Sequence, residues 1–412
     1  MQRELRPRPD ALGRPFWTLV GASGASNLAD GIFKLALPLI ALTYTRSPAL
    51  VAGVELARSL PWLLAALQVG AVVDRIDRRL AMARANVARA VFVTVPAAAL
   101  AMDSGSLWLL YLAAVGTGMS EVVYDTAAQS FLPSLVPKDQ LDRANGRLYA
   151  VEMGAQQFAG PPLAGALVAV SLVASLAVPS VLWVVAVVGL LQLRGTFRPE
   201  RTGPRTTIRA DVRQGLDFLL GHRILRTMAV MVGVGNLASS AATAVFVLFA
   251  VGPESPLGLS EPGFGLLFTL FAAGAMIGSV VTDRLVRRIG RAHSLTMSVV
   301  GMSLFTAAAA VTTNVPVIGA ASLVSGVAVM VWNITTVSYR QRVIPDHLLG
   351  RVNSAYRLLA WGTMPVGAAL GGALGEWFGV RSVFVVMTVA SLSLLIPDRV
   401  ITEESLREGE ST

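Results

Sequence analysis

The stretch that decides the fold is Gly70-Ala71-Val72-Val73-Asp74-Arg75-Ile76-Asp77-Arg78-Arg79, a run of opposite charges between two long apolar segments. A second copy of this pattern is Gly278-Ser279-Val280-Val281-Thr282-Asp283-Arg284-Leu285-Val286-Arg287-Arg288, again with glycine and small apolar residues before an aspartate and arginines. Each copy ends one predicted helix and precedes the next. The two copies therefore mark the same place in two similar halves of the chain.

The composition is that of an integral membrane protein. The chain has 412 residues, of which 54% are hydrophobic and 14% are charged, whereas about 25% of the residues of a soluble domain are charged. Its apolar runs are long enough to cross a hydrocarbon core of about 30 Å as helices, and they are too long for barrel strands. The sequence predicts an all-α integral membrane protein with twelve spans, near residues 16–44, 50–73, 80–102, 107–132, 147–171, 176–194, 226–251, 263–283, 293–313, 315–339, 350–375 and 380–397.

The predicted spans form two groups of six. Landmarks repeat between them, since Asn27-Leu28-Ala29 recurs as Asn236-Leu237-Ala238, an offset of 209 residues. Because six is an even number, both halves run in the same direction and are related by a pseudo-two-fold axis along the membrane normal. The predicted domains are an N-terminal half, a polar and arginine-rich linker, a C-terminal half and a tail, at residues 1–193, 194–225, 226–397 and 398–412.

Arginine and lysine gather in alternate loops, which predicts the orientation of the chain. By the positive-inside rule, both termini, the linker and the tail lie in the cytoplasm. The first apolar stretch is too long for a cleaved signal and leads into further spans, so it is interpreted as an uncleaved first helix. The prediction is a multi-pass protein of the cell (plasma) membrane.

Several classes of protein are excluded by what the sequence lacks. The chain has no cysteine, and its three histidines, His222, His293 and His347, stand singly in polar loops, so no metal site is expected. No cofactor is expected either. The loops account for the net charge of +9, so nucleic acid is not an expected partner. Neither Lys34 nor Lys138 follows a glycine-rich run, which argues against an ATP-driven pump, and no catalytic arrangement indicates an enzyme.

With these features, the chain resembles the major facilitator superfamily of secondary transporters over essentially its whole length. Within that superfamily it is similar to the drug and secondary-metabolite efflux branch, which includes macrolide and enterobactin exporters. The loop signature of the family is matched, with Asp77 in place of its second glycine, by Gly70, Asp74, Arg75, Arg78 and Arg79. The second loop copy supplies Asp283, Arg284, Arg287 and Arg288.

A second resemblance lies in span five. The antiporter signature of glycine, proline and a glycine pair is approximated by Gly154, Gly160, Pro161 and Gly165, with Ala164 departing from the pair. The resemblance implies a transporter that exports small amphipathic drugs or metabolites by proton antiport and alternating access. It also implies a bacterial monomer whose partners are a small-molecule substrate, protons and the lipid bilayer.

Ionisable residues inside the predicted spans are the sharpest functional signal, because such a group near the bilayer centre costs about 2.5–3.5 kcal/mol even on lenient scales. Asp30 lies near the middle of span one, with Lys34 on the same helical face. Glu121 and Asp125 share a face of span four that carries no basic residue. Desolvation and mutual repulsion disfavour two adjacent anions, so this pair is the predicted proton site, with Asp30 as a relay.

The resemblance further implies that spans one, four, seven and ten line a central cavity. Polar and aromatic residues fall on these four spans, at Asp30, Glu121, Asp125, Asn236, Trp332 and Asn333. The acids among them are confined to the N-terminal half. This asymmetry suggests that the first half handles protons and that both halves contact the substrate.

Alternatives remain open at this point. Asp30 could form a fixed ion pair with Lys34, and Asp74 could anchor the topology instead of gating one side of the membrane. The glycines and proline of span five suit either a hinge or ordinary tight packing. A proton-coupled importer or a lipid-moving relative of the same fold is the alternative function, because the sequence contains no indication of direction or substrate.

Overall fold

The computed structural model of the chain describes residues 12–73, 75–137, 140–195, 197 and 208–411. Within these residues the chain forms helices joined by loops and no β-strand. The helical segments of the first part are α1 (Arg14–Ala41), α2 (Pro48–Val73), α3 (Arg78–Ala101), α4 (Leu107–Phe131), η1 (Leu132–Ser134), α5 (Leu141–Met153), η3 (Gly154–Ala159), α6 (Gly160–Val170) and α7 (Leu172–Gln192). Those of the second part are α8 (Ile208–Gly221), α9 (Arg223–Ala250), α10 (Glu261–Ile289), α11 (Arg291–Val311), α12 (Val315–Val343), α13 (Asp346–Phe378), α14 (Val380–Ser393), α15 (Leu395–Asp398) and α16 (Glu403–Ser411).

Local sequence explains where several of these helices begin. Ser171, Ser260 and Asn314 each precede a helix, and the side-chain oxygen of each accepts a hydrogen bond from a backbone N–H three residues later. Such capping satisfies donors that the first turn of a helix leaves free. The long apolar stretches that follow supply the side chains that the helices bury against one another or present to lipid.

Nine helical segments among the described residues are long and apolar enough to cross a membrane. Of the expected spans, those formed by α1, by α3 and by α5 with α6 are not among the nine. These three carry Asp30 and Lys34, Arg84 and Arg89, and the break at η3. An all-helical membrane protein is thus confirmed, whereas a total of twelve spans stays a prediction.

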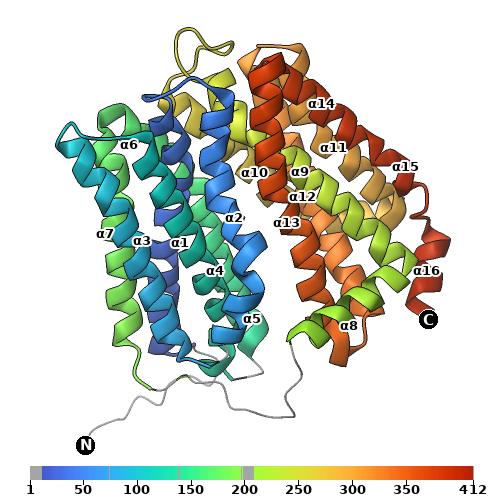
Figure 1. Cartoon of the computed structure of the whole chain (residues 1–412). Helices are drawn as coiled ribbons and strands as arrows, with labels where there is room; N and C mark the ends of the chain where they lie inside the picture. The colour runs from blue at the N-terminus through green and yellow to red at the C-terminus, as the bar shows by residue number, and fades with distance from the viewer. Residues whose placement is uncertain (1–11, 74, 138–139, 196, 198–207, 412) are drawn as a thin grey trace, which may run out of the picture.

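The helices form two groups that lie side by side (Figure 1). The first group contains α1 to α7, and the second contains α9 to α15, with α8 and α16 at the end of the molecule where α1 begins. Helix α8 falls inside the segment interpreted as a linker, so this polar segment includes a helix that the sequence analysis did not predict. Helix α16 likewise forms within the predicted tail.

The two groups meet along two pairs of helices, α2 with α13 and α6 with α10. At the second pair, the backbone of Gly165 lies against Glu261, and the backbone of Gly265 lies against Pro161. A side chain at either glycine would collide with the backbone of the opposite helix. Glycine is therefore required for the close contact between α6 and α10.

The segment interpreted as a hinge in span five is irregular. Helix α5 runs into the π-helical segment η3, which starts at Gly154, and α6 then starts at Gly160 with Pro161 in its first turn. Gly160 packs against the backbone of Gly31 in α1, and Gly165 packs against α10, whereas a Cβ at Gly154 would meet no atom within 4 Å. Two of the three glycines thus permit close packing of helices, and the third is the first residue of the π-helical segment.

Candidate functional site

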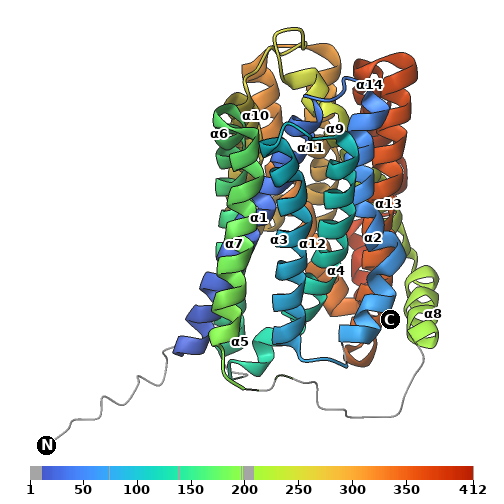
Figure 2. The ribbon, with the colours of Figure 1, turned by 60° about the vertical axis from the view of Figure 1, so that its left-hand side comes forward.

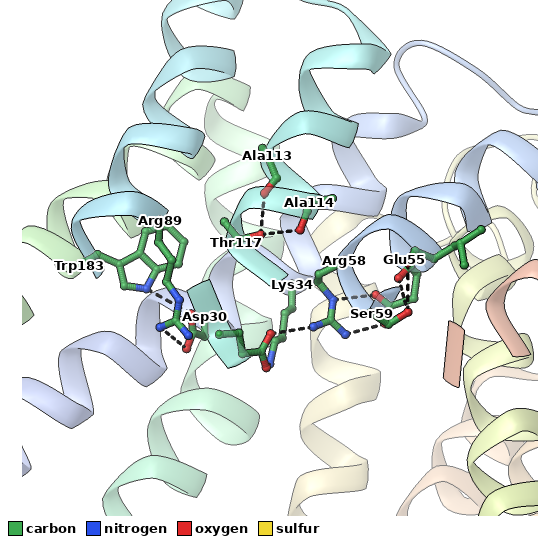
Figure 3. A network of polar contacts seen from close by, with 12 residues as sticks. Asp30, Lys34, Glu55, Arg58, Ser59, Arg89, Ala113, Ala114, Thr117 and Trp183 are labelled. Atoms are coloured by element: carbon green, nitrogen blue, oxygen red, sulfur yellow. Dashed lines mark hydrogen bonds and ion pairs between the residues drawn. The ribbon is translucent and has the colours of Figure 1, made fainter. Parts of the chain in front are cut away.

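Charged side chains inside α1 to α4 meet in the first group of helices (Figure 3). Asp30 is buried in α1, and its Oδ2 lies 3.2 Å from a guanidinium nitrogen of Arg89 in α3. The indole N–H of Trp183 in α7 donates to the other carboxylate oxygen at 3.2 Å. Arg89 is itself completely buried, and it also donates to Ser26 at 3.2 Å and to Asn86 at 3.1 Å. Asp30 of α1 is therefore held by side chains of two other helices, α3 and α7, and its basic partner is Arg89 instead of Lys34.

Lys34 instead bonds to Glu121 of α4. Its Nζ lies 2.8 Å from one oxygen of Glu121, and Arg58 of α2 lies 3.0 Å from the other oxygen. Arg58 also holds Glu55, one turn away on α2, through two hydrogen bonds of 2.6 and 2.9 Å. The absence of a basic residue on its own helix face thus did not leave Glu121 unpaired, because the partners come from α1 and α2.

Asp125 lies one turn after Glu121 on α4. Within the part of the chain that the structure describes, it forms no ion pair with a basic side chain closer than 4.0 Å. We call the seven groups Asp30, Lys34, Glu55, Arg58, Arg89, Glu121 and Asp125 the charge cluster. It contains four acids and three bases, so one acid can take up a proton without leaving a base uncompensated. Because an uncompensated charge is costly in an apolar surrounding, Asp125 is the acid best placed for that proton.

No described hydrogen bond or ion pair joins the predicted polar residues of the second group to the charge cluster. Asn236 of α9 donates to the carbonyl of Ala360 in α13 at 2.7 Å, so it joins two helices of its own group. Trp332 is buried in α12, and its indole N–H has no acceptor among the described residues. The side chain of Asn333 is exposed. The structure therefore brings the predicted acids together, whereas no described contact joins these three residues to them.

The charged loops are described in part. Asp74 lies outside the described residues, Arg75 is exposed, and Arg79 donates to the carbonyl of Leu193 after α7. Asp77, which stands where the family has glycine, caps α3 by accepting from Leu80 N–H at 3.1 Å and also accepts from Phe197 N–H at 2.8 Å. These contacts hold the first loop against the end of α7.

In the second loop copy, Asp283 pairs with Arg287 one turn later on α10. Arg284, Arg287 and Arg288 are all exposed. Gly70, at the start of the first copy, has open space where a Cβ would lie. The described contacts of both loop copies thus stay within the group of helices to which each copy belongs.

Polar contacts join the two groups of helices at two levels. At the end away from α8 and α16, Glu376 of α13 accepts from the hydroxyl of Ser47 at 2.6 Å and from Ala49 N–H at 3.2 Å. Nearer the other end, Arg357 of α13 donates to the side chain of Gln129 in α4 at 2.8 Å. The Arg357 guanidinium lies 4.3 Å from the ring of Trp361, which packs edge-on against another tryptophan, on α2.

Sequence reasoning missed Arg89, Arg357 and Trp183. Arg89 carried a usable signal, because an arginine in the middle of an apolar segment is as informative as the acids that were identified. Arg357 had none, since it lies near the end of a span, where arginine is expected as a topology signal. Among the described residues, no three His, Asp or Glu side chains gather in a way that could hold a metal ion.

Comparisons with known proteins agree with the fold. A family model described as the Major Facilitator Superfamily matches residues 19–362 and 232–409. The multidrug efflux pump Tap of Mycobacterium tuberculosis is 26% identical over 91% of this chain and 89% of its own length. An uncharacterised MFS-type transporter of the same species is 28% identical over 93% of this chain and 89% of its own length.

Two solved structures share the arrangement of helices at low sequence identity. The nucleoside transporter NupG superposes with a TM-score of 0.71 at 12% identity, over 94% of this chain and 98% of that one. A bacterial homologue of the iron transporter ferroportin, in its inward-facing state, also has a TM-score of 0.71, at 18% identity over 98% of this chain and 100% of that one.

Proposed function

Because the chain belongs to the Major Facilitator Superfamily, we propose that it exports small amphipathic compounds, drugs or secondary metabolites, in exchange for protons. It works as a bacterial monomer in the plasma membrane, with both termini in the cytoplasm. Its two halves, residues 1–193 and 226–397, move against each other so that the substrate site opens alternately to either side of the membrane. Export is supported by the relatives named as multidrug efflux pumps, among them Tap of Mycobacterium tuberculosis and Tap of Mycolicibacterium fortuitum, which is 24% identical.

The main support for proton coupling is the charge balance of the charge cluster. Glu121 is held by Lys34 and Arg58, and Asp30 is held by Arg89, so these two acids are compensated as anions. Asp125 has no such partner among the described residues, and it takes the proton in the proposed cycle. A cationic substrate that reaches Asp125 replaces the proton there, which is the physical basis of exchange.

Asp125 is also close to a contact between the halves. Gln129 follows it by one turn on α4 and accepts the hydrogen bond from Arg357 of α13. Arg357 forms no ion pair with Asp125 within 4.0 Å among the described contacts, so it is not counted in the charge cluster, but its charge attracts that of Asp125 from the other half. Protonation of Asp125 therefore weakens the attraction between α4 and α13, which links proton binding to movement of one half against the other.

The remaining predicted residues have supporting roles in this proposal. The loop residues Asp74, Arg75, Arg78 and Arg79, together with Asp283 and its neighbouring arginines, form contacts that differ between the two open states. The rings of Trp62 and Trp361, 4.8 Å apart where α2 meets α13, offer an aromatic surface to an amphipathic substrate. Trp332 offers a buried N–H that lacks an acceptor in the described chain.

The test is transport of ethidium, an amphipathic cation, by the purified protein in liposomes with an imposed pH gradient. The parental protein should accumulate ethidium on the acidic side. Asp125→Asn should lower the gradient-driven rate at least about tenfold, which corresponds to about 1.4 kcal/mol of activation free energy. It should keep the exchange of ethidium down its own concentration gradient. Glu254→Gln, in the exposed loop after α9, is the matched control and should transport at the parental rate.

Two outcomes would contradict the proposal. Gradient-driven transport by Asp125→Asn at the parental rate would place the proton site elsewhere. Accumulation on the alkaline side, so that ethidium moves with the proton, would show symport and favour the importer over the exporter.

A further inference from the structure

A second carboxyl group, Glu152 of α5, lies inside the first group of helices but outside the charge cluster. It is half-buried, and one of its oxygens accepts a hydrogen bond of 2.7 Å from the hydroxyl of Ser23 in α1. Among the described residues, no basic side chain forms an ion pair with it. Its charge reaches Tyr124 of α4 and Tyr149 of its own helix. Glu152 therefore shares with Asp125 the absence of a basic partner.

The position of Glu152 along the membrane normal differs from that of the charge cluster. Its partner Ser23 precedes Asp30 by seven residues on α1, which corresponds to about 10 Å at 1.5 Å per residue. Helix α5 lies at the end of the molecule where α1 begins (Figure 2). Glu152 is thus nearer than Asp30 to the end at which the proposed cytoplasmic loops lie.

A line of polar groups connects Glu152 with the charge cluster. The hydroxyl of Tyr124 is buried beside Ser23 and Ser26, yet it forms no hydrogen bond of good geometry with either. Ser26 accepts a hydrogen bond from Arg89, the partner of Asp30. The Arg89 guanidinium also lies 4.9 Å from the centre of the Tyr124 ring. The Tyr124 hydroxyl is therefore the one group in this line that still lacks a hydrogen-bond partner.

Close packing of the backbone fixes this arrangement. Gly31 of α1 lies against the carbonyl of Gln156 in η3, and Gly160 of α6 lies against Gly31. No side chain separates α1 from the α5 to α6 segment at this point. These backbone contacts fix how closely α1 lies against the segment that carries Glu152.

We propose that Glu152 is the group through which protons leave the charge cluster toward the cytoplasmic end, with the Tyr124 hydroxyl as the link that closes and opens the route. In this step, the proton that Asp125 releases enters the line at the Tyr124 hydroxyl as Tyr124 gives its own proton to Ser23. Ser23, which already donates to Glu152, passes its proton to that carboxylate. The net change is the transfer of one proton between two carboxyl groups, and no other covalent bond is made or broken.

This inference rests on the proposed function for its purpose, because only a proton-coupled transporter needs such a route. Its first test does not depend on transport. Time-resolved infrared spectra of the purified protein in lipid, after a jump in pH, report protonation of carboxyl groups directly. Glu152→Gln should remove one carboxyl signal, and Tyr124→Phe should keep that signal while slowing protonation of the remaining buried carboxyls by about tenfold or more.

Two further variants sharpen this test. Ser23→Ala removes the hydroxyl between Tyr124 and Glu152 and should also slow protonation of the remaining buried carboxyls. The inference therefore does not depend on the folding of Tyr124→Phe. Tyr149→Phe is the matched control, because Tyr149 is on the same helix as Glu152 but its side chain is exposed. It should behave as the parent.

The second test uses pH-driven ethidium transport in liposomes. Glu152→Gln, Tyr124→Phe and Ser23→Ala should all slow gradient-driven transport while leaving ethidium exchange without a pH gradient near the parental rate. An unchanged infrared signal in Glu152→Gln, or unchanged kinetics in both Tyr124→Phe and Ser23→Ala, would overturn the inference. Failure of the parental protein to use a pH gradient would instead contradict the proposed function, whatever the infrared result.

Discussion

Arg89 is a single side chain on which the first half of the molecule depends strongly. It is fully buried, it pairs with Asp30, and it donates to Ser26 and Asn86. We predict that Arg89→Gln lowers the free energy of unfolding by about 3–5 kcal/mol, because it leaves a buried carboxylate without its counter-ion. Thermal unfolding of the purified protein in detergent measures this loss.

Two variants serve as controls for this prediction. Arg84→Gln removes an exposed arginine from the same helix, and its effect should stay within about 0.5 kcal/mol. The double variant Asp30→Asn with Arg89→Gln should lose less than the sum of the single losses, because both residues serve one contact. Additive losses would mean that the two side chains act independently.

The sequence was sufficient to identify three acids of the charge cluster, Asp30, Glu121 and Asp125, but not the basic partners of Asp30 and Glu121. Helical spacing predicts that Asp30 and Lys34 share a face, and this is a local property. The pairing of bases with acids depends on how α1, α2, α3 and α4 pack against one another. In the structure Lys34 pairs with Glu121, and Arg89 is the partner of Asp30. For the same reason, the bond from Ser23 to Glu152 could not have been predicted from the residues alone.

Among the elements, α16 shows how charge attaches a short helix to the bundle. Glu410 bonds to Arg291 at the start of α11 and lies 2.9 Å from Arg342 at the end of α12. Glu403 accepts from the backbone N–H of Ala292 at 2.7 Å. The hydrogen bond from Arg291 holds the pKa of Glu410 below its ordinary value, and burial opposes this shift. Attachment of α16 should therefore depend on pH.

The sign follows from linkage. A carboxyl whose pKa is lowered in the folded state stabilises that state fully above its unfolded pKa of about 4.3 and loses this contribution as the pH falls through the folded pKa. We predict that α16 is docked at neutral pH and is released in acid. Because the chain has no cysteine, a spin label on Arg407→Cys, at an exposed position of α16, reports the change as increased mobility.

The control for this prediction is Glu410→Gln, which removes the titrating group. In that variant the label on α16 should be mobile already at neutral pH and should respond less to acid. A label that stays equally immobile from neutral to strongly acid pH in the parent would show that the apolar contact of buried Leu406 alone holds α16.

At the level of elements, the sequence predicted the long helices well and the irregular ones poorly. Long apolar runs permit little except a helix in lipid, so α9, α10 and α12 follow from composition alone. The π-helical turn η3 lies where α1 packs against span five, with the backbone of Gln156 beside Gly31, and such packing is not visible in the local sequence. Helix α8 is amphipathic and polar, and it packs on α13, a contact that the sequence does not encode locally.

For the whole molecule, the arginine distribution predicts a cytoplasmic location for both termini. Single cysteines at Glu254, in the exposed loop after α9, and at Arg407, in α16, allow a direct test. With a membrane-impermeant thiol reagent, Glu254→Cys should react in intact cells, whereas Arg407→Cys should react only after permeabilisation. The reverse pattern would invert the proposed orientation, and with it the direction assigned to the proton route through Glu152.

The excess of one acid over the bases in the charge cluster has an electrical consequence. With either one proton or one singly charged organic cation bound, the cluster is neutral, so a one-for-one exchange of ethidium and protons moves no net charge across the membrane. The membrane potential, which acts on each moving charge with about 2.3 kcal/mol per 100 mV, should then leave that exchange unaffected. Setting the voltage with valinomycin and potassium gradients should not change the ethidium rate, and a strong voltage dependence would contradict this charge balance. An uncharged compound exported against one proton would, by the same balance, be driven by the pH gradient and the membrane potential together.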